Sequence, residues 1–203
     1  MTDKRIIENI LFGMEKINQI NRILLWEIAK TEQIGPIQIQ FIEFIWRQPG
    51  NSVTISELAN EFNLKKPTVS DSIRNLEEKG FLIKERSQED SRVYYLSLTP
   101  RGEDKISRIR ETFSILSDVI RSFTDQEKET IFSFFIRFIL EMQNKGIIPG
   151  FRICMNCRNL QSGEEKGRWL CRLTGRSFSV NEMILNCRHY VTRSEKESSK
   201  EAL

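Results

Sequence analysis

The sequence has a single histidine, no glycine-rich phosphate loop and no His-Glu metal-hydrolase signature among its 203 residues. General acid–base catalysis is therefore poorly supplied, and we expect a protein that is not an enzyme. No run of about 18 apolar residues is present, as a membrane-spanning helix would require. The N-terminus also lacks the parts of a signal peptide. We therefore expect a cytoplasmic protein without a membrane partner.

Cysteine is absent from the first 153 residues, and all four cysteines follow within a short C-terminal part. Charge divides at the same place. Residues 1–150 contain 21 Lys and Arg against 22 Asp and Glu, whereas residues 151–203 contain 10 against 6. The net charge of +3 is a weak argument for nucleic-acid binding, so that case depends on local patches. The shift in composition after Pro149-Gly150 predicts a second domain.

Apolar residues recur in steps of three and four from Ile6 to Ile28, which predicts a long N-terminal helix. The apolar stripe is wider than a surface helix needs, so this helix is expected to pack against a partner. Gly35-Pro36 ends it and opens a second helix, Ile37 to Arg47, which stops before Pro49.

Residues 54–98 contain short, clearly punctuated elements. A short helix precedes a turn at residues 63–66, and a second helix follows from Pro67, as its first residue, to a stop at Gly80. Two strand-like segments, residues 81–86 and 93–98, are joined by a polar loop. This order of elements is that of a winged helix-turn-helix.

Two further helices are predicted after the hairpin. Thr99 is a candidate N-cap with Pro100 as the first helical residue. Thr124 and Glu127 have the spacing of a capping box that launches a last helix to about Asn144.

The second helix of the helix-turn-helix is suited to lie in a major groove with its first residues at base edges. Lysines there can neutralise phosphates, hydroxyl side chains can bond bases or phosphates, and arginines at the hairpin tip can enter a minor groove. Asp90 is expected to hold the tip in shape by pairing with Arg92 or Arg86. The candidate DNA-binding residues are Lys65, Lys66, Thr68, Ser70, Ser72, Arg74, Arg86 and Arg92.

Three segments carry a resemblance to a known family: Val53-Thr-Ile-Ser-Glu-Leu-Ala59, Pro67-Thr-Val-Ser-Asp-Ser-Ile-Arg-Asn-Leu-Glu-Glu-Lys-Gly-Phe81, and Asp90-Ser-Arg92 with Leu96-Ser-Leu-Thr-Pro-Arg-Gly102. With them, residues 1–145 resemble the MarR family of bacterial transcription regulators.

The MarR resemblance implies a homodimer built by the terminal helices and a pseudo-palindromic operator in double-stranded DNA. Relatives often bind aromatic ligands, so the resemblance also allows a small-molecule effector as a further partner. Many relatives have Arg where this chain has Asp71. Asp71 can accept from a cytosine or bond the N-terminus of its own helix, and we favour the second.

The cysteines follow the pattern Cys154-x2-Cys157-x13-Cys171-x15-Cys187. A close pair plus two further thiolates supplies the four ligands that tetrahedral zinc or an iron–sulfur cluster requires. Four free thiols or two disulfides are a third reading, disfavoured in a reducing cytosol. His189 is an alternative nitrogen ligand.

The cysteine segment also resembles high-potential iron–sulfur proteins over about 40 residues. We favour an iron–sulfur cluster over zinc, because a zinc ribbon normally has a second close pair. The hypothesis is a dimeric repressor or regulator whose four-cysteine centre senses redox state or metal. The alternative is an iron–sulfur redox protein or enzyme that uses the winged helix to bind other proteins.

The expected fold is mainly α, a winged helix-turn-helix with long dimerisation helices plus a small cysteine-rich metal-binding tail domain. The winged-helix domain is assigned to residues 1–148, with dimerisation parts at 1–31 and 101–144 and a DNA-binding part at 51–98. A metal-binding domain at residues 151–192 and a disordered tail at 193–203 complete the chain.

Overall fold

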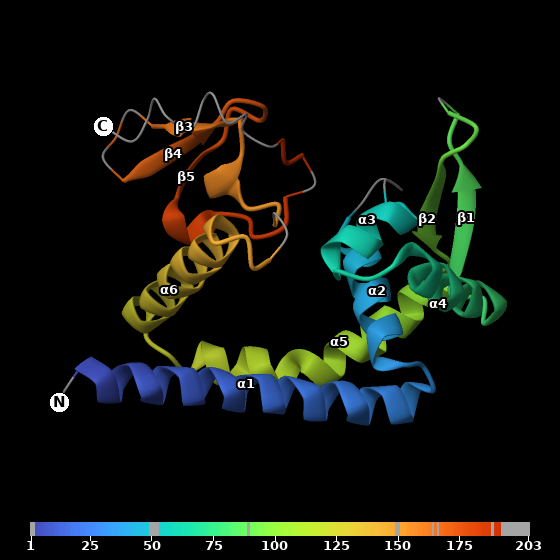
Figure 1. Ribbon diagram of the computed structural model, residues 1–203, viewed down its shortest axis with the longest axis horizontal. Coiled ribbons are helices and arrows are strands. Elements are labelled where there is room, and N and C mark those ends of the chain that lie inside the picture. The colour runs from blue at the N-terminus through green and yellow to red at the C-terminus, as the bar shows by residue number, and fades with distance from the viewer. Residues whose placement is uncertain are drawn as a thin grey trace. The chain divides into compact units, whose positions relative to one another are not determined.

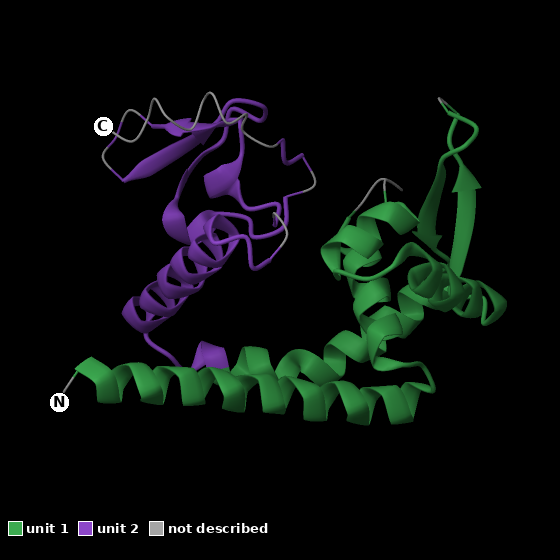
Figure 2. Ribbon diagram, viewed as in Figure 1, with its two compact units in different colours: residues 1–119 green, residues 120–203 purple. Residues whose placement is uncertain are grey.

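The computed structural model describes residues 3–48, 53–88, 90–148, 151–163, 165, 167–187 and 189–191. The chain divides into two compact units, residues 1–119 and 120–203, which Figure 2 shows in different colours. The tail predicted to be disordered, residues 193–203, lies outside the described residues, as do residues 51 and 52 of the predicted DNA-binding part.

The first unit has the predicted order of elements (Figure 1). A long helix and a short one precede the helix-turn-helix, the hairpin and a second long helix. They are α1 (Asp3–Glu32), α2 (Pro36–Trp46), α3 (Ile55–Glu61), α4 (Lys66–Glu78), β1 (Leu82–Arg86), β2 (Tyr94–Leu98) and α5 (Pro100–Arg121). The last residues of α5 fall in the second unit.

Local side-chain bonds fix where α5 begins. The Thr99 hydroxyl accepts a hydrogen bond from the Gly102 N–H at 3.0 Å, which confirms Thr99 as the N-cap, and donates to the Gly80 carbonyl at 2.7 Å. At Gly102 a Cβ would lie 2.1 Å from the Phe81 carbonyl oxygen, so only glycine lets α5 start this close to the end of α4.

The C-terminus of α4 also follows the prediction. Gly80 has φ +73°, and the next N–H, that of Phe81, bonds the Leu76 carbonyl at 2.9 Å. A left-handed residue of this kind satisfies the last carbonyls of a helix and turns the chain. It directs the chain from α4 straight into β1.

One apolar core holds the first unit together. Phe41 on α2 packs its ring 5.1 Å from that of Phe62, which follows α3. Each helix and strand of the unit contributes buried apolar side chains to this core, among them Ile28, Ile39, Phe41, Ile42, Leu58, Val69, Ile73, Leu76, Leu82, Leu96, Ile106 and Ile109.

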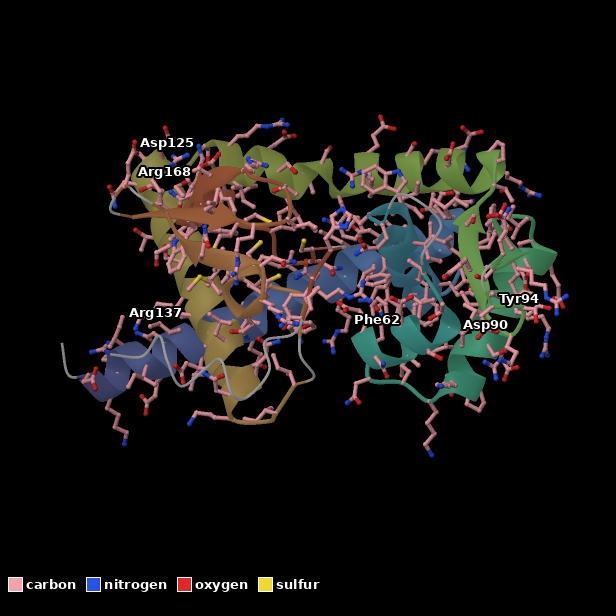
Figure 3. The ribbon with its side chains drawn as sticks, turned by 90° about the horizontal axis from the view of Figure 1, so that it is seen from above. Phe62, Asp90, Tyr94, Asp125, Arg137 and Arg168 are labelled. Atoms are coloured by element: carbon pink, nitrogen blue, oxygen red, sulfur yellow. The ribbon has the colours of Figure 1, made fainter. Side chains whose placement is uncertain are left out.

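The two strands β1 and β2 pair antiparallel from Leu82 opposite Leu98 to Arg86 opposite Tyr94. Val53 adds a bridge to Leu96 on the far side of β2. The hairpin projects beyond α3 and α4 in Figure 1, and Figure 3 labels Asp90 and Tyr94 on it. It is the wing that the sequence predicted.

The second unit joins one long helix to a small sheet. It contains α6 (Asp125–Asn144), a 3₁₀ turn η1 (Cys154–Asn156), β3 (Leu160–Ser162), β4 (Arg168–Cys171), β5 (Ser177–Ser179) and a second 3₁₀ turn η2 (Val180–Glu182). The three strands are antiparallel in the order β3-β4-β5. The predicted capping box starts α6, because the Thr124 hydroxyl accepts from the Glu127 N–H at 3.3 Å.

A small core joins α6 to the sheet. Its buried members are Ile136, Leu160, Phe178 and Met183, and the partly buried Phe132, Leu140, Trp169, Cys154 and Cys171 pack against them. In the part of the chain that the structure describes, no helix is both long and apolar enough to cross a membrane.

Candidate nucleic-acid interface

The predicted DNA-binding residues of α4 lie on its outer side. Val69, Ile73 and Leu76 are fully buried on the opposite side, so the amphipathic pattern fixes which face is free. Lys65, Lys66, Thr68 and Arg74 are exposed, and Ser70 and Ser72 are half-buried at the edge of that face.

The helix begins one residue earlier than predicted. Lys65 is the N-cap and Lys66 the first helical residue, which places Pro67 second rather than first. Proline is tolerated there because the first N–H groups of a helix have no intrahelical partner. The partial positive charge of the helix N-terminus adds to the two lysines, which together suit this end to phosphate.

Asp71 pairs with Arg74 of the same helix at 3.6 Å, and both side chains are well exposed. The prediction that Asp71 bonds the N-terminus of its own helix is wrong. The helix starts at Lys66, so Asp71 already lies in its second turn. An exposed ion pair of this kind contributes little to stability. Arg74 can therefore exchange it for a phosphate.

The tip of the wing is organised by two arginines. Asp90 pairs with Arg92, whose Nε and Nη2 donate to the two carboxylate oxygens at 3.1 Å each and whose backbone N–H donates at 3.0 Å. These bonds lower the pKa of Asp90 and raise that of Arg92. Arg86 donates from Nε to the Ser91 carbonyl at 2.7 Å. The Arg92 side chain remains 88% exposed, so the pairing orients it without covering it.

The structure brings the four cysteines together in one small unit. Cys154 and Cys157 lie in and directly after η1, and Cys171 ends β4 opposite Leu160. Cys187 returns beside the first pair, because its N–H bonds the Arg152 carbonyl at 2.8 Å while the Cys154 N–H bonds the Ile184 carbonyl at 3.2 Å.

The thiols differ in their surroundings. Burial raises the pKa of Cys154, and the charges of the other three cysteines add to the rise. Burial also acts to raise the pKa of Cys171, but hydrogen bonds from Thr174 and from the Leu173 N–H outweigh it and lower that pKa. Amide and hydroxyl donors to sulfur stabilise a thiolate.

A metal site is not confirmed by this geometry. Among the described residues, no three His, Cys, Asp or Glu side chains lie close enough to hold one metal ion. The four cysteines form no disulfide among the described residues, and His189 is exposed. Four soft donors gathered in one unit nevertheless fit the chemistry of zinc or an iron–sulfur cluster.

One polar contact to α4 was not predicted from the sequence. Gln38 on α2 donates to the Asn75 side chain at 3.0 Å. The two residues are 37 positions apart, and no local pattern signals that they meet.

Residues 32–93, from the end of α1 to the wing, match the model of the MarR family. The regulator Hpr of Geobacillus thermodenitrificans is 31% identical over 113 residues, which are 53% of this chain and 56% of that protein. SarU of Staphylococcus aureus is 22% identical over 118 residues, 55% of this chain and 47% of that protein. Both are named HTH-type transcriptional regulators, and the chain spans about half the length of these curated relatives.

Solved structures share the fold. A MarR family protein from Bacillus stearothermophilus has a TM-score of 0.57 and 21% identity, covering 71% of this chain and 99% of that one. The Staphylococcus aureus MepR–DNA complex has a TM-score of 0.55 and 17% identity, covering 64% and 96%. The chain thus contains a mainly helical MarR-type winged helix-turn-helix. The family match ends before the four cysteines.

Proposed function

We propose that this chain, whose residues 32–93 match the MarR family model, is a sequence-specific DNA-binding regulator of transcription that acts as a repressor. One observation carries the proposal: the free face of α4 is lined by lysines and hydroxyl side chains, and the wing beside it presents Arg86 and Arg92. The relatives Hpr and SarU are named as regulators, and MepR is described in a complex with DNA.

In this proposal α4 enters the major groove. Thr68 and Ser70 reach base edges, while Lys65 and Lys66 neutralise phosphates at the start of the helix. The wing arginines lie in the adjacent minor groove, where a narrow A·T-rich stretch attracts them. Arg92 is already oriented for this role by Asp90.

A second copy of the chain completes the proposed regulator. One face of α1 presents the large apolar side chains of Ile6, Ile10, Ile17 and Ile20 to solvent, each 38–53% exposed. A contiguous apolar surface of this kind is typical of a protein interface. A homodimer would cover it and present two α4 helices to the two halves of a pseudo-palindromic operator.

Selection from a random duplex library, followed by gel shifts at fixed salt, tests the proposal. We expect a pseudo-palindromic site, and we expect Arg92→Ala and Lys66→Ala each to weaken binding about 5- to 30-fold, as loss of one good DNA contact does. Lys128→Ala is the matched control, because it removes an exposed ion pair with Asp125 on α6. A protein that ignores all duplexes at low salt, or that instead turns over a substrate, would overturn the assignment.

The four cysteines are proposed as a metal site, with an iron–sulfur cluster favoured over zinc. Cys154, Cys157, Cys171 and Cys187 would be the ligands, and the bound group would supply either a structural crosslink or electron transfer. The convergence of three separate chain segments on one small unit, and the donors to Cys171, support the proposal. Metal and sulfide analysis of anaerobically purified protein tests it, with Cys157→Ser as the variant that should lose the bound group.

Sensing through this site is proposed to act through α6. Ile136 is buried in the small core to which Cys154 and Cys171 belong, whereas Ile131, Phe134 and Phe135 of the same helix are exposed. Loss of the metal would loosen the packing of α6, which follows α5 directly in the chain. We expect operator affinity to differ between metal-loaded and metal-free protein at fixed salt. Equal affinities would exclude sensing by this site, but they would not contradict the proposed DNA-binding function.

A further inference from the structure

The turn between α1 and α2 holds one side chain in a fixed direction. Gln38 lies in the first turn of α2, and its amide oxygen accepts from the Gly35 N–H at 3.0 Å. This bond satisfies one of the free N–H groups at the start of α2. It also leaves the amide nitrogen of Gln38 to point at α4.

The same amide group reaches the middle of α4. Its nitrogen donates to the Asn75 Oδ1 at 3.0 Å and, less closely, to the Ser72 carbonyl at 3.4 Å. Ser72 itself borders the free face of α4, and Arg74 lies on that face. Gln38 therefore contacts α4 at the edge of the face whose residues are proposed to meet DNA.

Hydrogen bonding matters here because apolar packing fixes which face of α4 is buried but still allows small rotations of the helix about its own axis. Val69, Ile73 and Leu76 attach α4 to the core through contacts that are not directional. A hydrogen bond weakens steeply as its angle departs from linear, so the Gln38 contacts resist a turn of α4 about its own axis.

A second contact ties α4 to the same turn. Lys79, after the last residue of α4, donates from Nζ to the Gln33 carbonyl at 3.0 Å. Lys105 of α5 donates to the carbonyl and the carboxylate of Glu32, at 3.1 and 2.7 Å. Residues 32–38 thus bond α4 on one side and α5 on the other.

We propose that Gln38 is a positioning residue that sets the rotation of α4 and thereby the discrimination between operator and other DNA. The inference rests on the proposed DNA-binding function. Base-edge contacts demand that short side chains such as Thr68 and Ser70 be aligned closely, whereas lysines on long stems find phosphates over a range of helix orientations. Loss of the bonds that hold the rotation of α4 should therefore lower the affinity for the operator more than the affinity for other DNA.

The experiment compares Gln38→Met with wild type on the selected operator and on a scrambled duplex at one salt concentration. Methionine keeps the length and apolar stem of glutamine but makes none of the three hydrogen bonds. We expect operator affinity to fall about 5- to 10-fold, as loss of one or two net hydrogen bonds implies, and scrambled-duplex affinity to change less than about twofold. Gln40→Met, two residues along α2, is the matched control and should leave both affinities unchanged.

A double-mutant cycle sharpens the assignment. Asn75→Leu should reduce operator affinity on its own, but little further in the Gln38→Met background, because the two side chains act through one bond. An equal loss on both duplexes, or additive effects in the cycle, would overturn the proposal and leave Gln38 a merely structural residue. Failure of wild type to bind any duplex would instead refute the proposed function, so the two failures are distinct.

Discussion

The two units of the chain are stabilised in different ways. The first unit has an extensive apolar core in which Phe41, Leu58, Ile73 and Leu76 are fully buried. The described part of the second unit has a much smaller buried set, Ile136, Ile153, Cys157, Leu160, Phe178 and Met183, around strands of three or four residues. A core of that size contributes little free energy, and small domains of this kind usually need a crosslink. The difference indicates that the first unit has the larger share of apolar stabilisation, and we propose that the four-cysteine unit depends on a metal bound by its thiols.

The ion pairs between described residues do little to compensate for the smaller core. The first unit has a well-shielded pair, Lys105 with Glu32, in which both side chains are under 15% exposed. In the second unit Glu182 pairs with Arg176 at 3.4 Å and Arg168 at 3.9 Å, but all three side chains are substantially exposed. Exposed pairs of this type contribute at most about 1 kcal/mol.

The largest expected effect tests the independence of the first unit. Phe41→Ala should lower its free energy of unfolding by about 3–5 kcal/mol, because the residue is fully buried against Phe62. Phe41→Leu is the control and should cost less, since leucine fills most of the same volume. Hydrogen exchange read peptide by peptide should show lost protection in α2 to α4 and none in β3 to β5. Equal loss in both units would contradict the division.

A substitution in the small core tests whether the second unit can unfold without the first. Ile136→Ala should destabilise it by about 2–4 kcal/mol, because this side chain joins α6 to the small core. Ile131→Ala, on the same helix but 39% exposed, should cost much less. Hydrogen exchange should show β3 to β5 opening while α3 and α4 stay protected. Metal added to the purified variant should restore protection if the thiols hold it.

The same contrast explains what the sequence could predict. The helices of the first unit were predictable because residues such as Gly80 and Thr99 mark their ends locally and a single apolar period runs through each. The sheet of the second unit was not, because strands as short as Leu160–Ser162 show no alternating pattern. At the proposed interface, the sequence predicted α4 and the wing correctly. It did not predict that Asp71 pairs with Arg74.

Long-range polar contacts could not be predicted from the sequence, for another reason. Nothing around Lys105 distinguishes it from a surface lysine, yet it is 8% exposed and bonds Glu32, 73 residues earlier in the chain. Gln38 and Asn75 meet in the same way. Such pairs depend on the tertiary fold, and no spacing rule within one element reports them.

A mid-sized effect is expected at the shielded ion pair of the first unit. Lys105→Met should cost about 1–3 kcal/mol at neutral pH, because the Glu32 carboxylate loses its closest donor and keeps only Arg108 at 3.5 Å. Removing an exposed lysine, as in Lys128→Ala, is the control and should change stability by less than about 0.5 kcal/mol. Chemical denaturation measures both.

The pH dependence of that loss has a defined sign. Burial acts to raise the pKa of Glu32, but Lys105 and Arg108 outweigh it and hold the pKa below its ordinary value of 4.5. A carboxyl whose pKa is lowered on folding stabilises the protein above the unfolded pKa and loses that contribution as pH falls through the folded pKa. The gap between wild type and Lys105→Met should therefore be full above pH 4.5 and shrink below it. A gap that persisted at low pH would assign the effect to packing instead.

The smallest expected effect lies at the exposed tip of the wing. Asp90→Asn removes the charge that holds Arg92, so the arginine loses its orientation but keeps its own charge. We expect operator affinity to fall roughly threefold, in line with the modest energy of exposed pairs, and less than in Arg92→Ala. The Arg92 bonds lower the pKa of Asp90 below its ordinary 3.8, so the carboxylate is charged throughout the range from pH 5 to pH 8. Gel shifts from pH 5 to pH 8 should therefore show a constant ratio between wild type and variant, and a ratio that drifted with pH would mean that another group orients the wing.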